Sequence, residues 1–354
     1  MAVVLVTGGA GFIGAHFCNL LMSSWGDEAS SSNHLIVLDL MTYAANPDYL
    51  AAIAKRKDFT LVEGNICDEV LLRRIFDEHQ IDTVINFAAE SHVDRSIHDA
   101  DEFVHTNFVG TYTLLKVCRH YWTLSDGMFK AGCRFHQVST DEVYGTLMPD
   151  EQAFTENNAF LPNSPYSASK AAADHMVRAF FQTWGLPVTT SHCSNNFGPF
   201  QYKEKLIPLT IERLLNNKPV PVYGDGLQVR DWLFVADHVA GINLILAKGQ
   251  IGEHYNIGGD WELTNLELIH RLCFMLEGKF AKQPELREHF PNAEAIVLGQ
   301  SAKLITHVAD RPGHDRRYAI DHSKLQALGY QPEANFDQTL SDTVDWYLDY
   351  FRDN

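Results

Sequence analysis

Three side chains that can move protons stand next to one another at Thr140, Asp141 and Glu142. They follow an apolar run, 133–138, whose composition is that of a buried strand. In a parallel α/β sheet, ligands bind beyond the carboxyl ends of the strands, so we expect these residues at an active site. Two adjacent carboxyls in one pocket can hold different protonation states, one as acid and one as base. The alternative is a solvated acidic turn, because charged residues are usually exposed.

A second chemically capable pair is Tyr166 and Lys170, at the start of a predicted helix that runs to Trp184. The spacing of four residues places both on one helix face, one turn apart. A lysine ammonium beside a phenol favours the phenolate, as does the positive charge of an oxidised nicotinamide. Tyr166 is therefore a candidate base toward a sugar hydroxyl. Ser164 is expected to cap this helix. The alternative is an interfacial tyrosine and a solvated lysine.

The chain begins with a pattern that predicts a strand, a glycine-rich turn and a helix. The strand is 2–7, and Gly8, Gly11 and Gly14 follow at a three-residue spacing before a helix through about Trp25. The first glycine permits the tight turn, the second lets the backbone approach a pyrophosphate, and the third lets the helix pack on the strand. In this position the pattern indicates a dinucleotide-binding turn.

The next predicted strand, 35–38, ends in Asp39. An acidic residue there can bind the hydroxyls of an adenosine ribose, and it favours NAD over NADP because it would repel the 2′-phosphate. The polar segment 26–33 is predicted to be a surface loop that absorbs a long spacing from Gly14. The alternative is an ordinary aspartate at a strand end.

Strands and helices continue to alternate along the first half of the chain. The predicted strands are 59–63, 83–87 and 133–138, and the predicted helices are 68–79 and 102–121. This alternation predicts an α/β fold with a Rossmann-type, doubly wound parallel sheet. Beyond Asn195 the alternation breaks down. We expect an NAD-binding domain over 1–194 and a smaller α/β substrate-binding lobe mainly over 195–354, with segments near 229–259 returning to the first domain.

Composition excludes several classes of function. The formal net charge of −17 argues against nonspecific nucleic-acid binding, which needs a basic face. We expect no membrane span and no secretory signal, and hence a cytoplasmic protein, because no apolar run is long enough and no basic segment precedes the first strand. The six cysteines are scattered and fit reduced thiols, and the seventeen histidines show no metal-binding spacing, so we expect no metal.

Together these residues resemble the extended short-chain dehydrogenase/reductase superfamily, and within it the nucleotide-sugar 4,6-dehydratases, above all those that act on dTDP-glucose. The matching segments are TGGAGFIG (7–14), AAESHVDRSI (88–97), STDEVYG (139–145), SPYSASKA (164–171), CSNNFGP (193–199), EKLIP (204–208), VYGDG (222–226), VRDWL (229–233), YNIGG (255–259) and DRPGHDRRYAID (310–321). STDEVYG is the specific segment, because epimerases of the superfamily usually carry Ser-Ser or Ser-Ala there and lack the Asp-Glu pair.

The resemblance implies a reaction that begins with removal of a proton from the sugar O4 by Tyr166 while hydride leaves C4 for NAD+. The resulting ketone acidifies C5, so that Glu142 can take the C5 proton while Asp141 protonates the departing C6 hydroxyl. Hydride then returns to C6, and Glu142 returns a proton to C5. Acid and base act on neighbouring carbons, which accounts for two adjacent carboxyls. Thr140 would hydrogen-bond O4, and Lys170 completes the catalytic set.

The resemblance also implies two adjoining binding sites. Besides the glycine turn, Asp39, Tyr166 and Lys170, the residues expected at the NAD site are Phe12, Ile13, Thr42, Asn65, Ile66, Ala88, Ala89, Ser91, Thr106 and Asn196. The residues expected to hold the nucleotide-sugar are His92, Thr140, Asn195, Glu204, Lys205, Leu206, Pro221, Tyr223, Arg230, Asn265, Asp310, Arg311, His314 and Tyr318. Arg230 and Arg311 suit a pyrophosphate because a guanidinium fork matches phosphate oxygens, and the alternative is surface ion pairs.

Two positions depart from the family pattern. Asn65 stands where the family usually has aspartate, and an amide can still hydrogen-bond adenine. Leu40 stands where the family often has lysine, which removes a cation near the adenosine end. We expect a modest change in cofactor contacts and no change in the chemistry.

Three functions remain open at this point. The first is a 4,6-dehydratase, and the second is a 4-epimerase or decarboxylase of the same fold. The third is a noncatalytic NAD-binding sensor. Epimerisation needs no acid at O6, so the Asp141-Glu142 pair favours the dehydratase, and the complete catalytic set argues against a sensor. Thymine and uracil differ by one methyl, a contact worth about 1–3 kcal/mol, so both dTDP-glucose and UDP-glucose remain candidates. The resemblance further implies a homodimer through helices 102–121 and 166–184.

Overall fold

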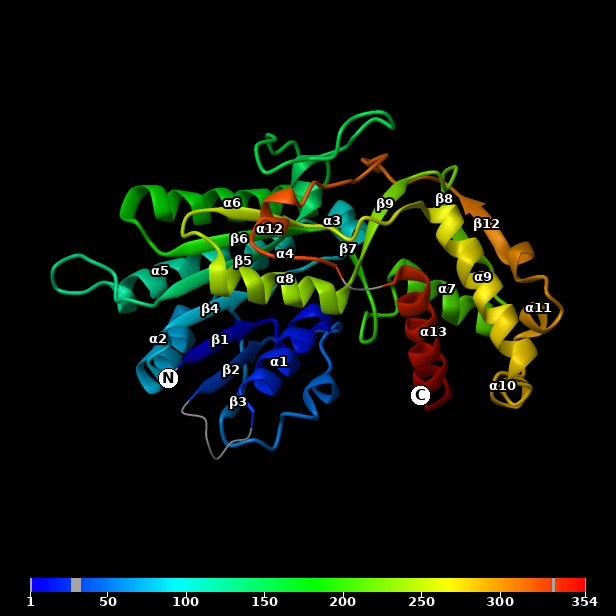
Figure 1. The fold of residues 1–354 in the computed structure, drawn as a ribbon, viewed down its shortest axis with the longest axis horizontal. Helices are drawn as coiled ribbons and strands as arrows, with labels where there is room; N and C mark the ends of the chain where they lie inside the picture. The colour runs from blue at the N-terminus through cyan, green and yellow to red at the C-terminus, as the bar shows by residue number, and fades with distance from the viewer. Residues whose placement is uncertain (1, 27–32, 333–334, 354) are drawn as a thin grey trace.

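The computed structural model describes residues 2–26, 33–332 and 335–353, so the loop predicted over 26–33 lies largely outside the described residues. Its centre is a seven-stranded sheet in the order β10-β6-β5-β4-β1-β2-β3 (Figure 1). The strands are β1 (Val3–Thr7), β2 (His34–Asp39), β3 (Phe59–Glu63), β4 (Thr83–Asn86), β5 (Arg134–Thr140), β6 (Val188–Cys193) and β10 (His254–Ile257). All pairs are parallel. The predicted doubly wound parallel sheet is confirmed.

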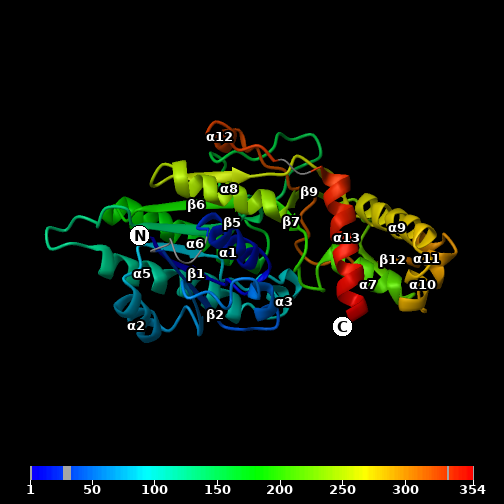
Figure 2. The same ribbon diagram turned by 60° about the horizontal axis from the view of Figure 1, so that its bottom comes forward.

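Helices cover both faces of this sheet (Figure 2). One face carries α1 (Phe12–Ser24) and α8 (Val235–Lys248), and the other carries α2 (Glu69–His79), α5 (Thr111–Trp122) and α6 (Pro165–Trp184). The central strands bury nearly every side chain, so each face needs an apolar helical layer. Ile242 of α8 and Ile257 of β10 belong to the second half of the sequence. Both are fully buried in the hydrophobic layer that contains α1 and α8.

The helix predicted over 102–121 contains an irregularity. It consists of α4 (Asp101–Phe103), a π-helix η3 (Val104–Gly110) and α5. Inside the π-helix, the amide of Asn107 donates to the Glu90 carbonyl at 3.0 Å and to Ser169 Oγ at 2.8 Å. Apolar spacing alone does not distinguish α from π turns, so the sequence pattern missed this change. The π-helix ties the segment after β4 to helix α6.

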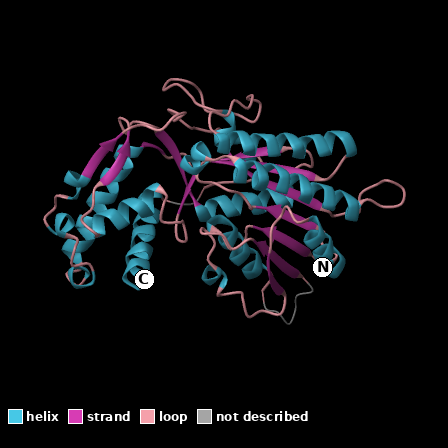
Figure 3. Ribbon diagram, turned by 180° about the vertical axis from the view of Figure 1, so that it is seen from behind, coloured by secondary structure: helices cyan, strands magenta, loops and turns pink. Residues whose placement is uncertain are grey.

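The second lobe contains two small sheets and a helical layer (Figure 3). One sheet has the order β11-β9-β7 and the other pairs β12 with β8. These strands are β7 (Asn195–Phe197), β8 (Val220–Tyr223), β9 (Val229–Phe234), β11 (Glu262–Thr264) and β12 (Ile305–Val308). The longer helices are α7 (Leu206–Leu215), α9 (Asn265–Lys282) and α13 (Phe336–Asp353). Further short elements among the described residues are η2 (Pro47–Leu50), α3 (Val93–His98), η4 (Asp141–Tyr144), α10 (Leu286–His289), α11 (Glu294–Val297), η5 (Ser301–Leu304) and α12 (Ser323–Gln326).

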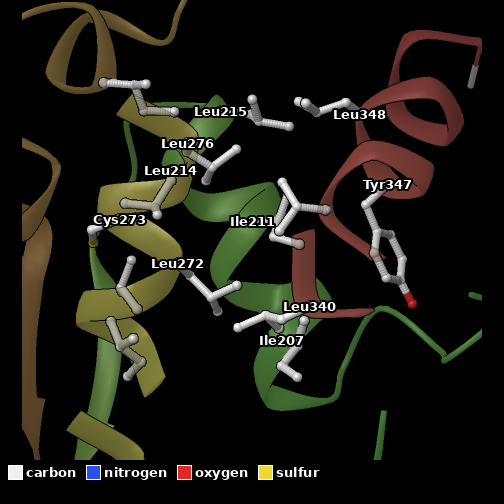
Figure 4. Close-up of a cluster of buried hydrophobic side chains, with 14 of the residues drawn as sticks. Ile207, Ile211, Leu214, Leu215, Leu272, Cys273, Leu276, Leu340, Tyr347 and Leu348 are labelled. Carbon is white, nitrogen blue, oxygen red and sulfur yellow. The ribbon is translucent and has the colours of Figure 1, made fainter. Parts of the chain in front are cut away.

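The second lobe has its own hydrophobic core, where α7, α9 and α13 meet (Figure 4). Ile211 of α7, Leu272 of α9 and Leu340 of α13 are fully buried in it. Complete burial of one such side chain stabilises a fold by about 1.5–3 kcal/mol. This core packs the three helices of the second lobe against one another. Among the described residues, no helix has the length and apolarity needed to span a membrane.

Candidate active site

A cavity of about 690 Å³ lies at the carboxyl ends of the central strands and is lined by residues of both lobes. It gathers most of the residues that the sequence singled out. From the NAD-site and catalytic sets these are Gly8, Gly11, Phe12, Ile13, Gly14, Asp39, Thr42, Asn65, Ile66, Ala88, Ala89, Ser91, Thr106, Thr140, Glu142, Tyr166, Lys170 and Asn196. From the nucleotide-sugar set they are His92, Asn195, Glu204, Lys205, Leu206, Pro221, Tyr223, Arg230, Asn265, Arg311 and His314. Asp141, Asp310 and Tyr318 are not among the lining residues.

The glycine turn between β1 and α1 shows why each glycine is needed. Gly8 has φ +70, and a Cβ there would lie 2.6 Å from the Ala88 nitrogen. A Cβ at Gly14 would lie 2.3 Å from the Gly8 carbonyl oxygen. At Gly11 the surrounding protein leaves more space, since a Cβ would meet only the Gly8 oxygen, at 3.3 Å. Gly11 also faces the cavity, where a side chain would stand in the way of a ligand. This open backbone at a helix N-terminus fits a dinucleotide pyrophosphate.

Replacing Gly14 by alanine is expected to destabilise the turn, because the added methyl overlaps backbone that cannot move independently. Overpacking of this kind costs about 1–3 kcal/mol in the free energy of unfolding. Urea denaturation measures it, together with the affinity for NAD. Gly278→Ala in α9 is the matched control, because a Cβ there meets nothing within 4 Å. The control should be neutral or more stable by about 0.5–1 kcal/mol. Equal stability of Gly14→Ala and wild type would contradict the overlap.

Asp39 occupies the end of β2, beside the glycine turn. Its carboxylate accepts from the Ala10 N–H and from the Met41 N–H, each at 2.9 Å. Burial raises the pKa of Asp39, while these two backbone donors oppose that effect. The carboxylate therefore holds the turn and also faces the cavity, at the position predicted for a ribose contact. Asn65, at the departure from the family pattern, accepts from the Cys67 N–H at 2.8 Å.

The Thr140-Asp141-Glu142 segment bends away from β5 into the short helix η4. The Thr140 hydroxyl donates to Asp141 Oδ1 at 3.3 Å and accepts from the Glu142 N–H at 3.3 Å. The turn separates the two carboxyls. Glu142 lines the cavity, whereas Asp141 is only 2% exposed and its Oδ2 has no partner among the described residues.

The environments of the two carboxyls raise their pKa values to different degrees. Burial raises the pKa of Asp141 well above its usual range, and the charges of Glu142 and Asp231 raise it further. Burial also raises the pKa of Glu142, but the cations of Arg230 and Arg311 oppose that effect. The pKa of Asp141 is raised more than that of Glu142, and two carboxyls whose pKa values differ suit an acid–base pair. The prediction of a solvated acidic turn is excluded by this burial.

Tyr166 and Lys170 lie on the first turns of α6, and both line the cavity. Ser164 caps this helix with a capping box, as predicted. Burial raises the pKa of Tyr166 well above its usual range, and the charge of Glu142 adds to this effect. Lys170 is 3% exposed, and its Nζ donates to the Val138 carbonyl at 2.7 Å. Lys170 is not among the groups that lower the pKa of Tyr166, so a base function of Tyr166 requires additional positive charge.

Arg230, on β9, is the most tightly held cation of the cavity. Its guanidinium donates to the carbonyls of Val229 at 2.7 Å and Asp315 at 3.0 Å, and it stacks 4.2 Å above the Tyr318 ring. The Tyr318 hydroxyl in turn donates to Asp315 Oδ2 at 2.5 Å. Tyr318 thus supports Arg230 from behind and does not face the cavity. The sequence pattern placed Tyr318 in the right motif but could not assign this supporting position.

Asp310 also supports other residues and does not line the cavity. Its Oδ1 lies 2.6 Å from His314 Nδ1, and its Oδ2 accepts from Gln228 Nε2 at 3.2 Å. His314 does line the cavity, so Asp310 orients it.

The sequence analysis missed some lining residues, of which Asp94 is the most informative. Asp94 of α3 accepts from Arg311 at 3.3 Å and from the Tyr223 hydroxyl at 3.3 Å, which joins the two lobes across the cavity. Its position inside the AAESHVDRSI segment was the available signal. Other missed lining residues include Glu90, Cys193, Ser194, Gln201, Tyr202 and Trp232. Among the described residues, no group of three or more His, Cys, Asp or Glu side chains is placed to hold a metal ion.

The protein class follows from comparison with known families. The model of the GDP-mannose 4,6 dehydratase family matches residues 5–343, and the chain belongs to this family. The resemblance to nucleotide-sugar 4,6-dehydratases is thereby confirmed.

Individual relatives carry a narrower name. The chain is 49% identical to the dTDP-glucose 4,6-dehydratase of Xanthomonas campestris pv. campestris (strain B100), over 98% of this chain and 93% of that protein. It is 47% identical to the dTDP-glucose 4,6-dehydratase of Haemophilus influenzae, over 98% of each. The crystal structure of the Streptomyces venezuelae dTDP-glucose 4,6-dehydratase DesIV, with NAD bound, matches with a TM-score of 0.84 at 42% identity. That match covers 98% of this chain and 97% of the other.

Proposed function

We propose that this protein is an NAD-dependent dTDP-glucose 4,6-dehydratase, a hydro-lyase that converts dTDP-glucose to dTDP-4-keto-6-deoxyglucose and water. The observation that carries the proposal is the buried Asp141 next to Glu142 in the chain, where Glu142 and Tyr166 both line the cavity. Relatives of the same name at 47–49% identity support the substrate.

The residues at the glycine turn fit NAD as the resident cofactor. The open backbone at Gly11 and the carboxylate of Asp39 would hold its pyrophosphate and its adenosine ribose. When bound, NAD+ supplies a hydride acceptor next to C4 of the sugar and an adjacent positive charge. Leu40 is 46% exposed at the cavity edge, so this end of the site lacks the cation that relatives often have.

The proposed proton transfers belong to three residues. Tyr166, made more acidic by the cofactor's charge, removes the O4 proton from the sugar. Glu142, whose pKa is raised by burial and lowered in part by the cations of Arg230 and Arg311, takes the proton at C5. Asp141, held neutral by burial, donates a proton to the C6 hydroxyl as it leaves as water. Its unpartnered Oδ2 is the atom that remains available for this donation.

Binding of the nucleotide-sugar is assigned to the second lobe. Arg230 and Arg311 provide guanidinium groups for the pyrophosphate, and Lys205 adds a third cation at the same cavity. We propose on this basis that residues 1–194 mainly bind NAD and 195–354 mainly bind substrate, with α8 and β10 returning to the first sheet. UDP-glucose is the alternative substrate, and 4-epimerisation is a less favoured activity because it leaves Asp141 without a role.

Two further proposals rest on indirect support. A homodimer would use α5 and α6, where Tyr112 and Trp184 remain 42% and 43% exposed. A cytoplasmic location fits the six cysteines, which are all free thiols and mostly buried.

Arg230→Lys is expected to weaken nucleotide-sugar binding about 10- to 100-fold, because an ammonium cannot reproduce a fork held by two carbonyls and an aromatic ring. Isothermal titration with dTDP measures the change directly. Arg316→Lys is the matched control, because Arg316 pairs with Asp225 on the surface and does not line the cavity. If both variants bind dTDP like wild type, Arg230 is not a pyrophosphate ligand.

Mass spectrometry of dTDP-glucose and UDP-glucose after incubation in D2O tests the proposed activity. The expected result is loss of one water, with deuterium gained at C5, and faster turnover of dTDP-glucose. Faster turnover of UDP-glucose would change the assigned nucleotide base from thymine to uracil. An unchanged mass with conversion to the galactose isomer would replace the dehydratase by an epimerase.

A further inference from the structure

A buried polar cluster adjoins the catalytic residues and has no part in the proposed proton transfers. It consists of Ser139, Tyr144, Asp174, His192 and Asn256, all at most 5% exposed. Of its members, Ser139 also lines the cavity. Ser139 Oγ donates to Asp174 Oδ2 at 2.6 Å, and His192 Nε2 lies 3.2 Å from the same oxygen. The Tyr144 hydroxyl donates to Asn256 Oδ1 at 2.9 Å and lies 3.3 Å from His192 Nδ1.

The order of contacts excludes a nucleophilic triad. The carboxylate of Asp174 lies between the serine and the histidine, so the imidazole cannot take a proton from the Ser139 hydroxyl. The cluster instead holds one carboxylate oxygen in place from two sides. The other oxygen, Oδ1, has no partner among the residues that the structure describes.

Asp174 is placed to act on Lys170. It follows Lys170 by one turn of α6, so both side chains leave the same face of the helix. Burial lowers the pKa of Lys170, and the charge of Asp174 is the largest effect opposing it. The Val138 carbonyl that Lys170 contacts immediately precedes Ser139, so one stretch of β5 positions both the ammonium and the carboxylate.

We propose that Asp174 is a positioning residue of the active site, whose carboxylate, held by Ser139 and His192, keeps the buried Lys170 ammonium charged at the cofactor cavity. This inference builds on the proposed function, in which Lys170 supports the cofactor and Tyr166. It assigns a role to Asp174, a charged residue that lies outside the sequence segments that resemble the family.

Other titratable groups near Lys170 do not take over this role. The Cys193 thiol of β6 also faces Lys170, but burial raises the pKa of that thiol, so it stays neutral. Burial and the charge of Glu142 disfavour the phenolate of Tyr166 itself. On the side of Asp174, the cluster contains His192, Tyr144 and the hydroxyl of Ser139, with Asn256 hydrogen-bonded to Tyr144, and the His254 ring packs against His192.

The test is the affinity for NAD between mildly acidic and strongly alkaline pH, followed by intrinsic tryptophan fluorescence. The affinity for NAD is expected to fall at alkaline pH, where Lys170 loses its charge. Lys170→Met identifies this decline, because the variant lacks it. Removing the opposite charge lowers the pKa of Lys170, so Asp174→Asn should move the decline to lower pH by about 1 pH unit. At pH values between the decline of Asp174→Asn and that of wild type, the variant would bind NAD about tenfold more weakly than wild type. Below this range of pH the two affinities would be the same.

Ser139→Ala is the matched control, because it removes a hydrogen bond to the carboxylate and keeps the charge. We expect a much smaller movement than in Asp174→Asn, and no effect of Asp174→Asn in the Lys170→Met background. A uniform loss of affinity at every pH would overturn the proposal and make Asp174 a packing group. Equal movements in Ser139→Ala and Asp174→Asn would overturn the assignment to charge.

Two provisions keep the test decisive. If Asp174→Asn does not fold, Asp174→Ser removes the charge while keeping a hydroxyl beside Ser139 and His192, and the same comparison applies. The titration uses NAD alone and no sugar substrate. A protein that fails to turn over dTDP-glucose but shows the displaced decline would disprove the proposed function and support the role of Asp174.

Discussion

Replacing Tyr166 by phenylalanine is expected to lower the rate of sugar oxidation by about 10²- to 10⁴-fold, the usual contribution of a general base. The ring of Tyr166 is 9% exposed and fills the space between α6 and the cavity, so removal of the hydroxyl alone should leave packing intact. A single turnover with dTDP-glucose, followed by the absorbance of reduced nicotinamide, measures this step.

The pH dependence of the rate of sugar oxidation should also reveal the role of Tyr166. Burial and the charge of Glu142 raise the pKa of Tyr166, so the base form is scarce at low pH and the wild-type rate should rise with pH. Tyr330→Phe is the matched control, because Tyr330 is a buried tyrosine whose hydroxyl donates to the Gly258 carbonyl, and it does not line the cavity. Oxidation at the wild-type rate in Tyr166→Phe would remove this tyrosine from the mechanism.

Asp141→Asn is expected to slow the loss of water by about 10²- to 10⁴-fold while affecting oxidation at C4 much less. An amide keeps the shape of the carboxyl but cannot give its proton to the departing hydroxyl. Reduced nicotinamide should therefore accumulate during the first turnover, and mass spectrometry should show a sugar that has been oxidised but has not lost water. Asp225→Asn, on the surface, is the control.

Stability separates this chemical effect from damage to the fold. Because the pKa of Asp141 is raised in the native state, the native protein binds this proton more tightly than the unfolded chain does. The stability that this proton contributes is present below the unfolded-state pKa and is lost as pH rises through the native-state pKa. Asp141→Asn removes that dependence, so the variant should unfold no more easily than wild type at neutral pH. Water loss at an unchanged rate in a stable variant would assign the acid to another residue.

Local patterns predicted those parts of the protein whose conformation depends on neighbours in the chain. The spacing of Gly8, Gly11 and Gly14 indicated the turn because backbone conformation and close approach are local requirements. The four-residue spacing of Tyr166 and Lys170 placed both on one face because helical periodicity is local as well. Alternation of strands and helices predicted the sheet for the same reason.

Contacts between distant segments could not be read from such patterns. Adjacent Asp141 and Glu142 looked equivalent in the chain, but η4 buries one and turns the other into the cavity. Tyr318 supports Arg230 across 88 positions of the chain, and Asp94 meets Arg311 across 217. Protonation states and supporting contacts depend on which groups exclude water from each other, and only the packed arrangement of both lobes determines that.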